Sequence, residues 1–277
     1  MQASTSTWTA PSGVLGRIVA ESRERVRGLS RDARDELERA AQRPAPAGAG
    51  FAAALRAGTA VAVIAEVKRR SPSKGEINAA LSAGAQAKAY AAGGAAAISV
   101  LTEPTHFGGS LDDLLEASGS VTVPLLRKDF IVDRTQLLQA RGAGASAALL
   151  IARALEPTRL AELAAEATAL GIEPLVEVRT EEELARAIPI ARVIGVNQRD
   201  LETLEIDGSV TERLIPLVPS DRVAIAESGV RSRDDIERAA ASGADAVLVG
   251  SMLSASADAA AAVLALAGVP RRGRDAG

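Results

Sequence analysis

The chain has 277 residues, 47% of them hydrophobic and 24% charged, so it can bury a large core and is not intrinsically disordered. Its formal net charge of -3 provides no basic surface, so neither nucleic acid nor an anionic membrane is an expected partner. The absence of cysteine, and a single histidine at His106, exclude disulfides, thiol nucleophiles, histidine metal clusters and a histidine-based triad.

Residues 1–50 are predicted to form an N-terminal extension. After a polar Ser/Thr-rich start, apolar residues recur among charges at a helical spacing and predict one helix from Val14 to about Gln42. The sequence APAGAG at 45–50 ends it. The start of the chain lacks a basic segment followed by an apolar run, and the apolar stretches are short. We therefore expect a cytoplasmic protein without a membrane segment.

Eight short apolar runs follow, with helix-period segments between them. The predicted strands cover 61–67, 96–101, 123–126, 147–151, 173–178, 192–196, 223–226 and 246–249, and the clearest helices cover 79–92, 133–142, 157–170 and 231–241. Buried strands that alternate with helices are typical of parallel β/α units. We expect one catalytic domain over 51–269 and a flexible tail over 270–277.

The number of strands favours an α/β fold of the (β/α)8 TIM-barrel type, with the helical extension covering the barrel mouth. A doubly wound open sheet is the alternative. That fold usually has a glycine-rich turn after its first strand, and here the place is taken by KRRSPS at 68–73. The closed barrel is therefore the prediction.

Lysine is rare in this chain, since only four of the 32 cationic residues are lysines: Lys68, Lys74, Lys88 and Lys128. A buried lysine can act as an acid, base or nucleophile, whereas arginine keeps its proton near neutral pH. Lys74 and Lys88 fit ordinary surface positions. Lys68 and Lys128 follow predicted strands and are the candidates for chemistry.

Charged and polar residues end most of the predicted strands. Glu66 and Lys68 share one face of the first strand, and further polar residues end the third, fifth, sixth and seventh strands: Lys128, Glu177, Asn197, Arg199 and Glu227. Because active sites of such barrels lie at the carboxyl ends of the strands, these side chains should converge at the mouth. The alternative is an ion-pair network that only caps the barrel.

The last two strands end in small residues. Ser228 and Gly229 follow the seventh strand, and Gly250 and Ser251 follow the eighth. Free backbone N–H groups at the starts of helices favour phosphate, and barrels often bind phosphate after these two strands. Glycines also occur at such turns for conformational reasons alone, so the pairs indicate a phosphate site mainly because both occur together.

Seven motifs, in this order, resemble those of the indole-3-glycerol phosphate synthase family. They are IAEVKRRSPS at 64–73, LTEPTHFGGS at 101–110, LRKDFIV at 126–132, LVEV at 175–178, GVNQRDL at 195–201, AESGV at 226–230 and VGS at 249–251. The first is far more specific than a lone glycine pattern. The resemblance covers about residues 14–268, including the helical extension.

The resemblance implies conversion of 1-(2-carboxyphenylamino)-1-deoxyribulose 5-phosphate to indole-3-glycerol phosphate, CO2 and water without a cofactor or a metal. It implies that Lys128 is the general acid of ring closure, that Glu177 moves a proton in dehydration, and that Glu66 pairs with a lysine. Lys68, Asn197, Arg199 and Glu227 complete the catalytic set. The implied substrate-binding residues are Ser71, Phe107, Phe130, Leu149, Leu201, Ser228, Gly229, Gly250 and Ser251, with Pro72 beside the ring.

The expected partner is therefore a small phosphorylated substrate. We expect a monomer, with an association with other tryptophan-pathway enzymes left open. Two alternatives remain: another phosphate-sugar barrel enzyme such as an isomerase, and a noncatalytic barrel that acts as a scaffold. An isomerase does not need the EVKRRSPS motif at 66–73 or a second lysine at 128, and a scaffold should have lost ionisable residues from the mouth.

Overall fold

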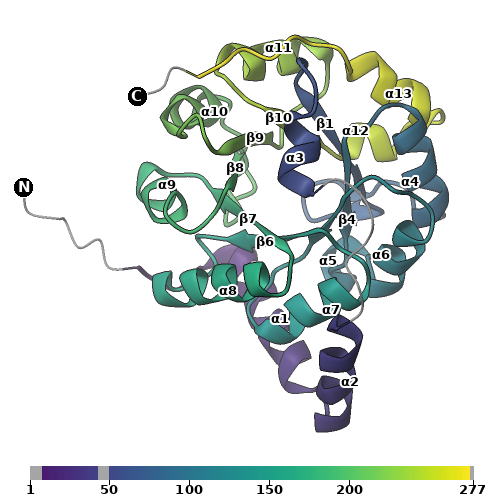
Figure 1. Cartoon of the computed structure of the whole chain (residues 1–277), viewed down its shortest axis with the longest axis vertical. Coiled ribbons are helices and arrows are strands. Elements are labelled where there is room, and N and C mark those ends of the chain that lie inside the picture. The colour runs from purple at the N-terminus through teal and green to yellow at the C-terminus, as the bar shows by residue number, and fades with distance from the viewer. Residues whose placement is uncertain (1–7, 43–49, 275–277) are drawn as a thin grey trace, which may run out of the picture.

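The computed structural model describes residues 8–42 and 50–274, and its centre is a closed barrel of eight parallel strands (Figure 1). The order around the barrel is β1-β10-β9-β8-β7-β6-β5-β4. The barrel strands are β1 (Ala62–Val67), β4 (Ala97–Leu101), β5 (Leu125–Lys128), β6 (Ala147–Ile151), β7 (Glu173–Val178), β8 (Val193–Asn197), β9 (Val223–Glu227) and β10 (Ala246–Val249). The predicted (β/α)8 barrel is confirmed, and all eight predicted strands are present.

Helices surround the barrel and alternate with its strands (Figure 1). They are α4 (Ala83–Ala92), α6 (Leu111–Ser118), α7 (Arg134–Gly142), α8 (Pro157–Ala169), α9 (Glu181–Ala187), α10 (Ser209–Leu214) with a 3-10 turn (Ile215–Leu217), α11 (Arg233–Ala241) and α13 (Ala259–Leu266). Short elements lie in the loops at the mouth: β2 (Arg70–Ser71), β3 (Gly75–Glu76), α5 (Pro104–Phe107) and α12 (Ser251–Ser254). None of the helices in the described ranges is both long enough and apolar enough to span a bilayer.

The third barrel strand begins two residues later than predicted, at Leu125 instead of Val123. Pro124 has no N–H group, so regular pairing starts after it. Lys128 is consequently the last residue of β5 and pairs in register with Leu101 of β4. Its side chain is held by the strand and not by a loop.

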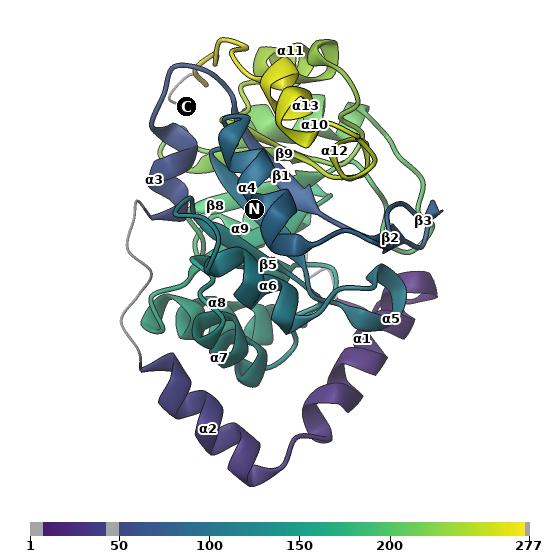
Figure 2. The ribbon, with the colours of Figure 1, turned by 90° about the vertical axis from the view of Figure 1, so that its right-hand side faces the viewer.

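The N-terminal extension contains two helices where one was predicted. α1 (Gly13–Arg27) ends at Gly28, and α2 (Arg31–Ala41) begins after Ser30, whose side chain accepts a hydrogen bond from the Ala33 N–H. A serine N-cap starts a new helix in this way. α1 lies at the mouth and α2 packs against α7, whereas α3 (Phe51–Arg56) closes the opposite end of the barrel (Figure 2). The domain boundary at residue 50 stays a prediction.

Residues 270–274 pack against the barrel, where we expected a flexible tail. Pro270 bridges to Ala60, and the Arg274 guanidinium is almost fully buried. It donates to the Asp245 carboxylate at 2.9 Å and to the carbonyls of Val218 and Gly243. Asp245 also accepts the Ala224 N–H at 2.8 Å, so Arg274 ties the tail to the start of β9. Residues 275–277 lie outside the described residues.

We expect Arg274→Met to lower the free energy of unfolding by about 1–3 kcal/mol, because several charge-assisted hydrogen bonds to buried acceptors are lost. Denaturant titration with circular dichroism measures this. Arg272→Met is the matched control, since Arg272 is exposed on the same segment. Equal stability of the two variants would contradict a structural role for the tail.

Candidate active site

One pocket opens at the carboxyl ends of the strands, and every predicted site residue lines it. Its walls include the seven residues predicted as catalytic, Glu66, Lys68, Lys128, Glu177, Asn197, Arg199 and Glu227, and the nine predicted to bind substrate, Ser71, Phe107, Phe130, Leu149, Leu201, Ser228, Gly229, Gly250 and Ser251. Strands order these side chains because residues two apart on one strand share a face. The structure therefore brings all sixteen together.

Lys128 lies between two carboxylates from across the barrel. Its Nζ donates to Glu177 Oε2 at 3.0 Å and lies 3.1 Å from Glu227 Oε2. Both carboxylates are buried, with residue exposures of 3% and 1%. The ammonium is thus fixed in place by strands β7 and β9 before any substrate enters.

Charges around Lys128 decide its protonation. Burial lowers the pKa of Lys128, but the carboxylates, led by Glu177 and Glu227, outweigh burial and raise that pKa above the value of a free lysine. The neighbouring carboxylates therefore outweigh the desolvation that would otherwise favour a neutral lysine. Burial also raises the pKa of Glu227 to about 8, against the opposing charge of Lys128. The site therefore holds a protonated lysine and a carboxyl that titrates near neutral pH.

The raised pKa of Glu227 predicts how stability changes with pH. The folded chain binds this proton more tightly than the unfolded chain, where the ordinary value is 4.5. The stabilisation by this proton is complete below pH 4.5 and is lost as the pH rises towards about 8. We expect wild type to lose more stability than Glu227→Gln over this range, as measured by urea titration at each pH. Parallel curves for the two proteins would contradict the shift.

Glu66 and Lys68 form a second ion pair, with Glu66 Oε1 and Lys68 Nζ 2.6 Å apart. A Cβ at Gly250 would lie 2.2 Å from Glu66 Oε1 and 2.7 Å from Lys68 Nζ. A side chain at 250 would therefore displace this ion pair. Similarly, a Cβ at Gly195 would lie 2.0 Å from Glu227 Oε1, so Gly195 makes room for that carboxylate. Sequence reasoning missed Gly195.

The ends of β9 and β10 offer free hydrogen-bond donors. Ser228 and Gly229 both have left-handed backbones, with φ of 64° and 78°. Within the described residues, the backbone N–H groups of Ser228, Gly229, Gly250 and Ser251 have no acceptor. The helix start expected after β9 is not part of this site, since α11 begins only at Arg233 and is capped by Ser232. The turn itself supplies the donors there, and strain of this kind is frequent at ligand sites.

Two further cations line the same end of the pocket. Lys74, which we assigned to an ordinary surface position, and Arg231 both border it, and neither forms an ion pair in the part of the chain that the structure describes. Burial and then the nearby charge of Arg231 lower the pKa of Lys74. Both side chains are exposed, and two unpaired positive charges that border one pocket favour an anion there. The signal in the sequence was Lys74 in SPSK at 71–74, but it does not indicate an anion site until the position of this loop at the pocket is known.

Arg199 is held by the backbone. Its Nη1 donates to the Leu204 carbonyl at 2.8 Å, and its N–H donates to Asn197 Oδ1 at 2.9 Å. Arg199 forms no ion pair with any described residue. Burial, and then the charge of Arg231, lower the pKa of Arg199, and both residues line the pocket.

An apolar wall faces the anion end. The rings of Phe107 and Phe130 have their centroids 6.0 Å apart, and Leu149 and Leu201 lie beside them. Val14 and Ile18 of α1 also line the pocket, and they could not be predicted as site residues because core packing explains two apolar helix residues equally well. The arrangement suits a flat apolar ring at one end and an anion at the other, with Lys128 between them.

The comparisons with known proteins agree with this geometry. The family model described as indole-3-glycerol phosphate synthase matches residues 15–266. The chain belongs to the indole-3-glycerol phosphate synthase family. It is therefore a carboxy-lyase of tryptophan biosynthesis.

Several curated members of the family are close in sequence. Indole-3-glycerol phosphate synthase 2 of Streptomyces coelicolor is 46% identical over 262 residues, which cover 93% of this chain and 100% of the relative. The synthase of a Nocardioides species is 51% identical over 208 residues, covering 75% and 80%. Among solved structures, thiamine phosphate pyrophosphorylase from Pyrococcus furiosus matches with a TM-score of 0.53, 14% identity and coverage of 74% and 93%, which supports the barrel fold alone.

Proposed function

We propose that the pocket converts 1-(2-carboxyphenylamino)-1-deoxyribulose 5-phosphate to indole-3-glycerol phosphate, CO2 and water. The observation that carries this proposal is the Lys128 ammonium, held by two buried carboxylates between an apolar wall and a cluster of unpaired cations and N–H groups. The substrate carries a carboxylated ring at one end and a phosphate at the other. Its reacting carbonyl then lies in the middle.

Lys128 acts in ring closure. Its protonated Nζ donates to the ketone oxygen while the ring carbon that bears the carboxylate attacks the ketone carbon, so the oxygen becomes a hydroxyl. CO2 then leaves, and its bonding electrons restore the aromatic ring. An ammonium kept charged by the neighbouring Glu177 carboxylate is loaded as a donor at neutral pH.

Dehydration needs a second proton transfer. The new hydroxyl leaves as water with a proton, and the adjacent CH2 loses one to form the indole double bond. Glu177 moves a proton in this step, because its carboxylate contacts Lys128 and can exchange protons with it. Glu227 has a pKa near neutrality and shares this task. Every step is acid–base chemistry, so the proposal uses no cofactor.

The remaining residues bind and orient. Lys68, which is held in position by its ion pair with Glu66, binds an anionic group of the substrate. Asn197 fixes the backbone of Arg199. Phosphate binds the N–H groups after β9 and β10, with Ser71, whose buried hydroxyl has no partner in the described structure. Phe107, Phe130, Leu149, Leu201 and Pro72 surround the ring. We also infer a monomeric, cytoplasmic enzyme.

The test is turnover by the purified chain. The product contains a fluorescent indole ring, so a continuous fluorescence assay with the synthetic substrate measures the reaction. Trapping the released CO2 provides an independent measure. Equal rates of CO2 and indole formation are expected. Conversion of a phosphate sugar between isomers, without CO2, would overturn the proposal in favour of an isomerase, and no reaction at all would favour a scaffold.

A prediction for the anion end follows from its unpaired cations. We expect Arg231→Gln to raise KM by about threefold to fivefold with kcat nearly unchanged, because an exposed charge contributes modest binding in ground and transition states alike. The inhibition constant of inorganic phosphate should rise in parallel. Lys88→Gln, on the exposed side of α4, is the control. Unchanged constants for phosphate would place the anion elsewhere.

A further inference from the structure

One face of α1 contacts both loops that carry the aromatic pair. Glu21, Ser22 and Arg25 are spaced i, i+1 and i+4 along the helix, so their side chains point towards the same side. Phe107 belongs to the loop after β4, and Phe130 belongs to the loop after β5. Both loops are far from α1 along the chain, yet each forms hydrogen bonds with it.

On the Phe107 side, the contact runs through Glu103. This fully buried carboxylate caps α5 by accepting the N–H groups of Thr105, His106 and Phe107 at 2.6–3.1 Å. Arg25 Nη1 donates to Glu103 Oε1 at 3.0 Å. Arg25 is the one described cation that pairs with Glu103, so it balances the charge that fixes the turn carrying Phe107.

On the Phe130 side, the contacts hold the backbone of the ring residue itself. Asp129 Oδ1 accepts the Phe130 N–H at 2.8 Å and also accepts Arg25 Nη2 at 3.2 Å. The Phe130 carbonyl accepts the Ser22 hydroxyl at 2.6 Å and Gln136 Nε2 at 3.1 Å. Both polar atoms of this peptide position are therefore fixed, one through Arg25 and one through Ser22.

We propose that Ser22 and Arg25 are positioning residues that set the gap between Phe107 and Phe130, and thereby make the pocket select a flat aromatic ring. A single guanidinium joins the acid that caps the Phe107 turn to the acid that caps the Phe130 N–H. Through Asp129, it also acts next to Lys128. The inference deepens the proposed function and rests on it for the identity of the ring.

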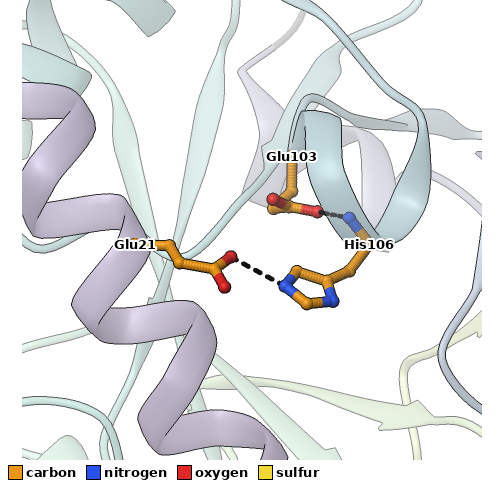
Figure 3. Close-up of side chains that lie close together, drawn as sticks. All are labelled: Glu21, Glu103 and His106. Carbon is orange, nitrogen blue, oxygen red and sulfur yellow. Dashed lines mark hydrogen bonds and ion pairs between the residues drawn. The ribbon is translucent and has the colours of Figure 1, made fainter.

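A third contact attaches α1 to the same turn. Glu21 Oε2 lies 2.7 Å from His106 Nε2, and Figure 3 shows the pair pointing at each other across the space between α1 and α5. Ligand atoms of Glu21, Glu103 and His106 lie within 4.8 Å of one another, which is close enough for a cation. Both oxygens of Glu103 are already used by Arg25 and the α5 N–H groups, so the cluster serves as an attachment.

Removing Arg25 has a defined structural consequence. Glu103 and Asp129 are exposed by 0% and 2%, and Asp129 keeps a second cation, Arg127, at 2.9 Å, whereas Glu103 keeps none. A buried carboxylate without a cation moves or takes up a proton. The turn with Phe107 then shifts relative to Phe130, whose carbonyl stays anchored by Ser22 and Gln136. The gap changes while the barrel remains intact.

Binding measurements separate the ring from the phosphate. The probe is the alcohol made by reducing the ketone of the proposed substrate, which keeps the ring and the phosphate and cannot close. We expect Arg25→Met and Ser22→Ala to weaken this probe about tenfold by calorimetry, while inorganic phosphate binds as in wild type. In turnover, KM rises by a similar factor and kcat falls less than about threefold. Arg25→Lys keeps one ion pair, so its affinity for the alcohol should lie between those of wild type and Arg25→Met.

Arg27→Met is the matched control. Arg27 also lies on α1, its side chain is 71% exposed, and its one ion pair with a described residue is with Glu24 of the same helix. Thermal melting checks that each variant folds. Wild-type affinity for the alcohol in both Arg25→Met and Ser22→Ala overturns the proposal. Parallel loss of alcohol and phosphate binding also overturns it, since α1 then supports the whole mouth. Wild-type protein that binds the alcohol but forms no indole contradicts the proposed function alone, and the variant affinities still decide the positioning role.

Discussion

Lys128→Arg is expected to reduce turnover by about 10²- to 10⁴-fold although the positive charge is kept. The planar guanidinium cannot place a donor at the position of an ammonium that lies 3.0 Å from Glu177 and 3.1 Å from Glu227, so it cannot deliver the proton to the ketone oxygen. Indole fluorescence under saturating substrate measures kcat. KM should change much less than kcat, because the donated proton matters most in the transition state.

Lys88→Arg provides the matched control for this substitution, since it makes the same change at an exposed site on α4. Circular dichroism should give identical spectra for the two variants. A Lys128→Arg protein that keeps more than half of wild-type turnover would remove the general-acid assignment and leave Lys128 as a charge that only balances the two carboxylates.

Glu177→Gln is expected to reduce turnover by a similar factor, through a different step. The amide keeps the size and hydrogen-bonding reach of the side chain but cannot accept or release the proton of dehydration. Substrate affinity should stay within a few fold of wild type. In a single turnover, CO2 should be released before indole appears, because ring closure precedes the blocked step.

Glu173→Gln controls for loss of a carboxylate from the same strand, since Glu173 lies at the other end of β7 and pairs with exposed Arg192. CO2 and indole that fall together in Glu177→Gln, with no intermediate, would place Glu177 in ring closure, where it keeps Lys128 charged. Normal rates of both would make its catalytic assignment wrong.

The site could be predicted largely because parallel strands order it. Once 173–178 and 223–226 are recognised as strands, Glu177 and Glu227 must lie at the mouth, whatever the loops do. The same logic located Lys68 and Asn197. Motif resemblance then separated a synthase from other barrels, which the residues alone left open.

Contacts between distant loops could not be predicted. The pairing of Arg25 with Glu103 and Asp129 joins three segments that no local pattern relates. Lys74 is exposed, as expected, but nothing in its sequence neighbours indicates that it also borders the pocket together with Arg231. The protonation state of Lys128 could not be predicted either, because its raised pKa depends on how closely two other strands bring their carboxylates to the ammonium.

The pairing of β1 with β10 joins residues 62–65 to residues 246–249, and Gly250 of the last strand end makes room for the ion pair of the first. During synthesis, the first strand must therefore wait for nearly the whole chain before its final neighbour exists. Such distant pairings are slow to form. A nascent chain that has not yet delivered its last strand leaves a row of unpaired backbone groups on β1, where it is open to chaperones and to aggregation. Catalytic activity should then appear in one late step of folding, when β1 pairs with β10 and the barrel closes.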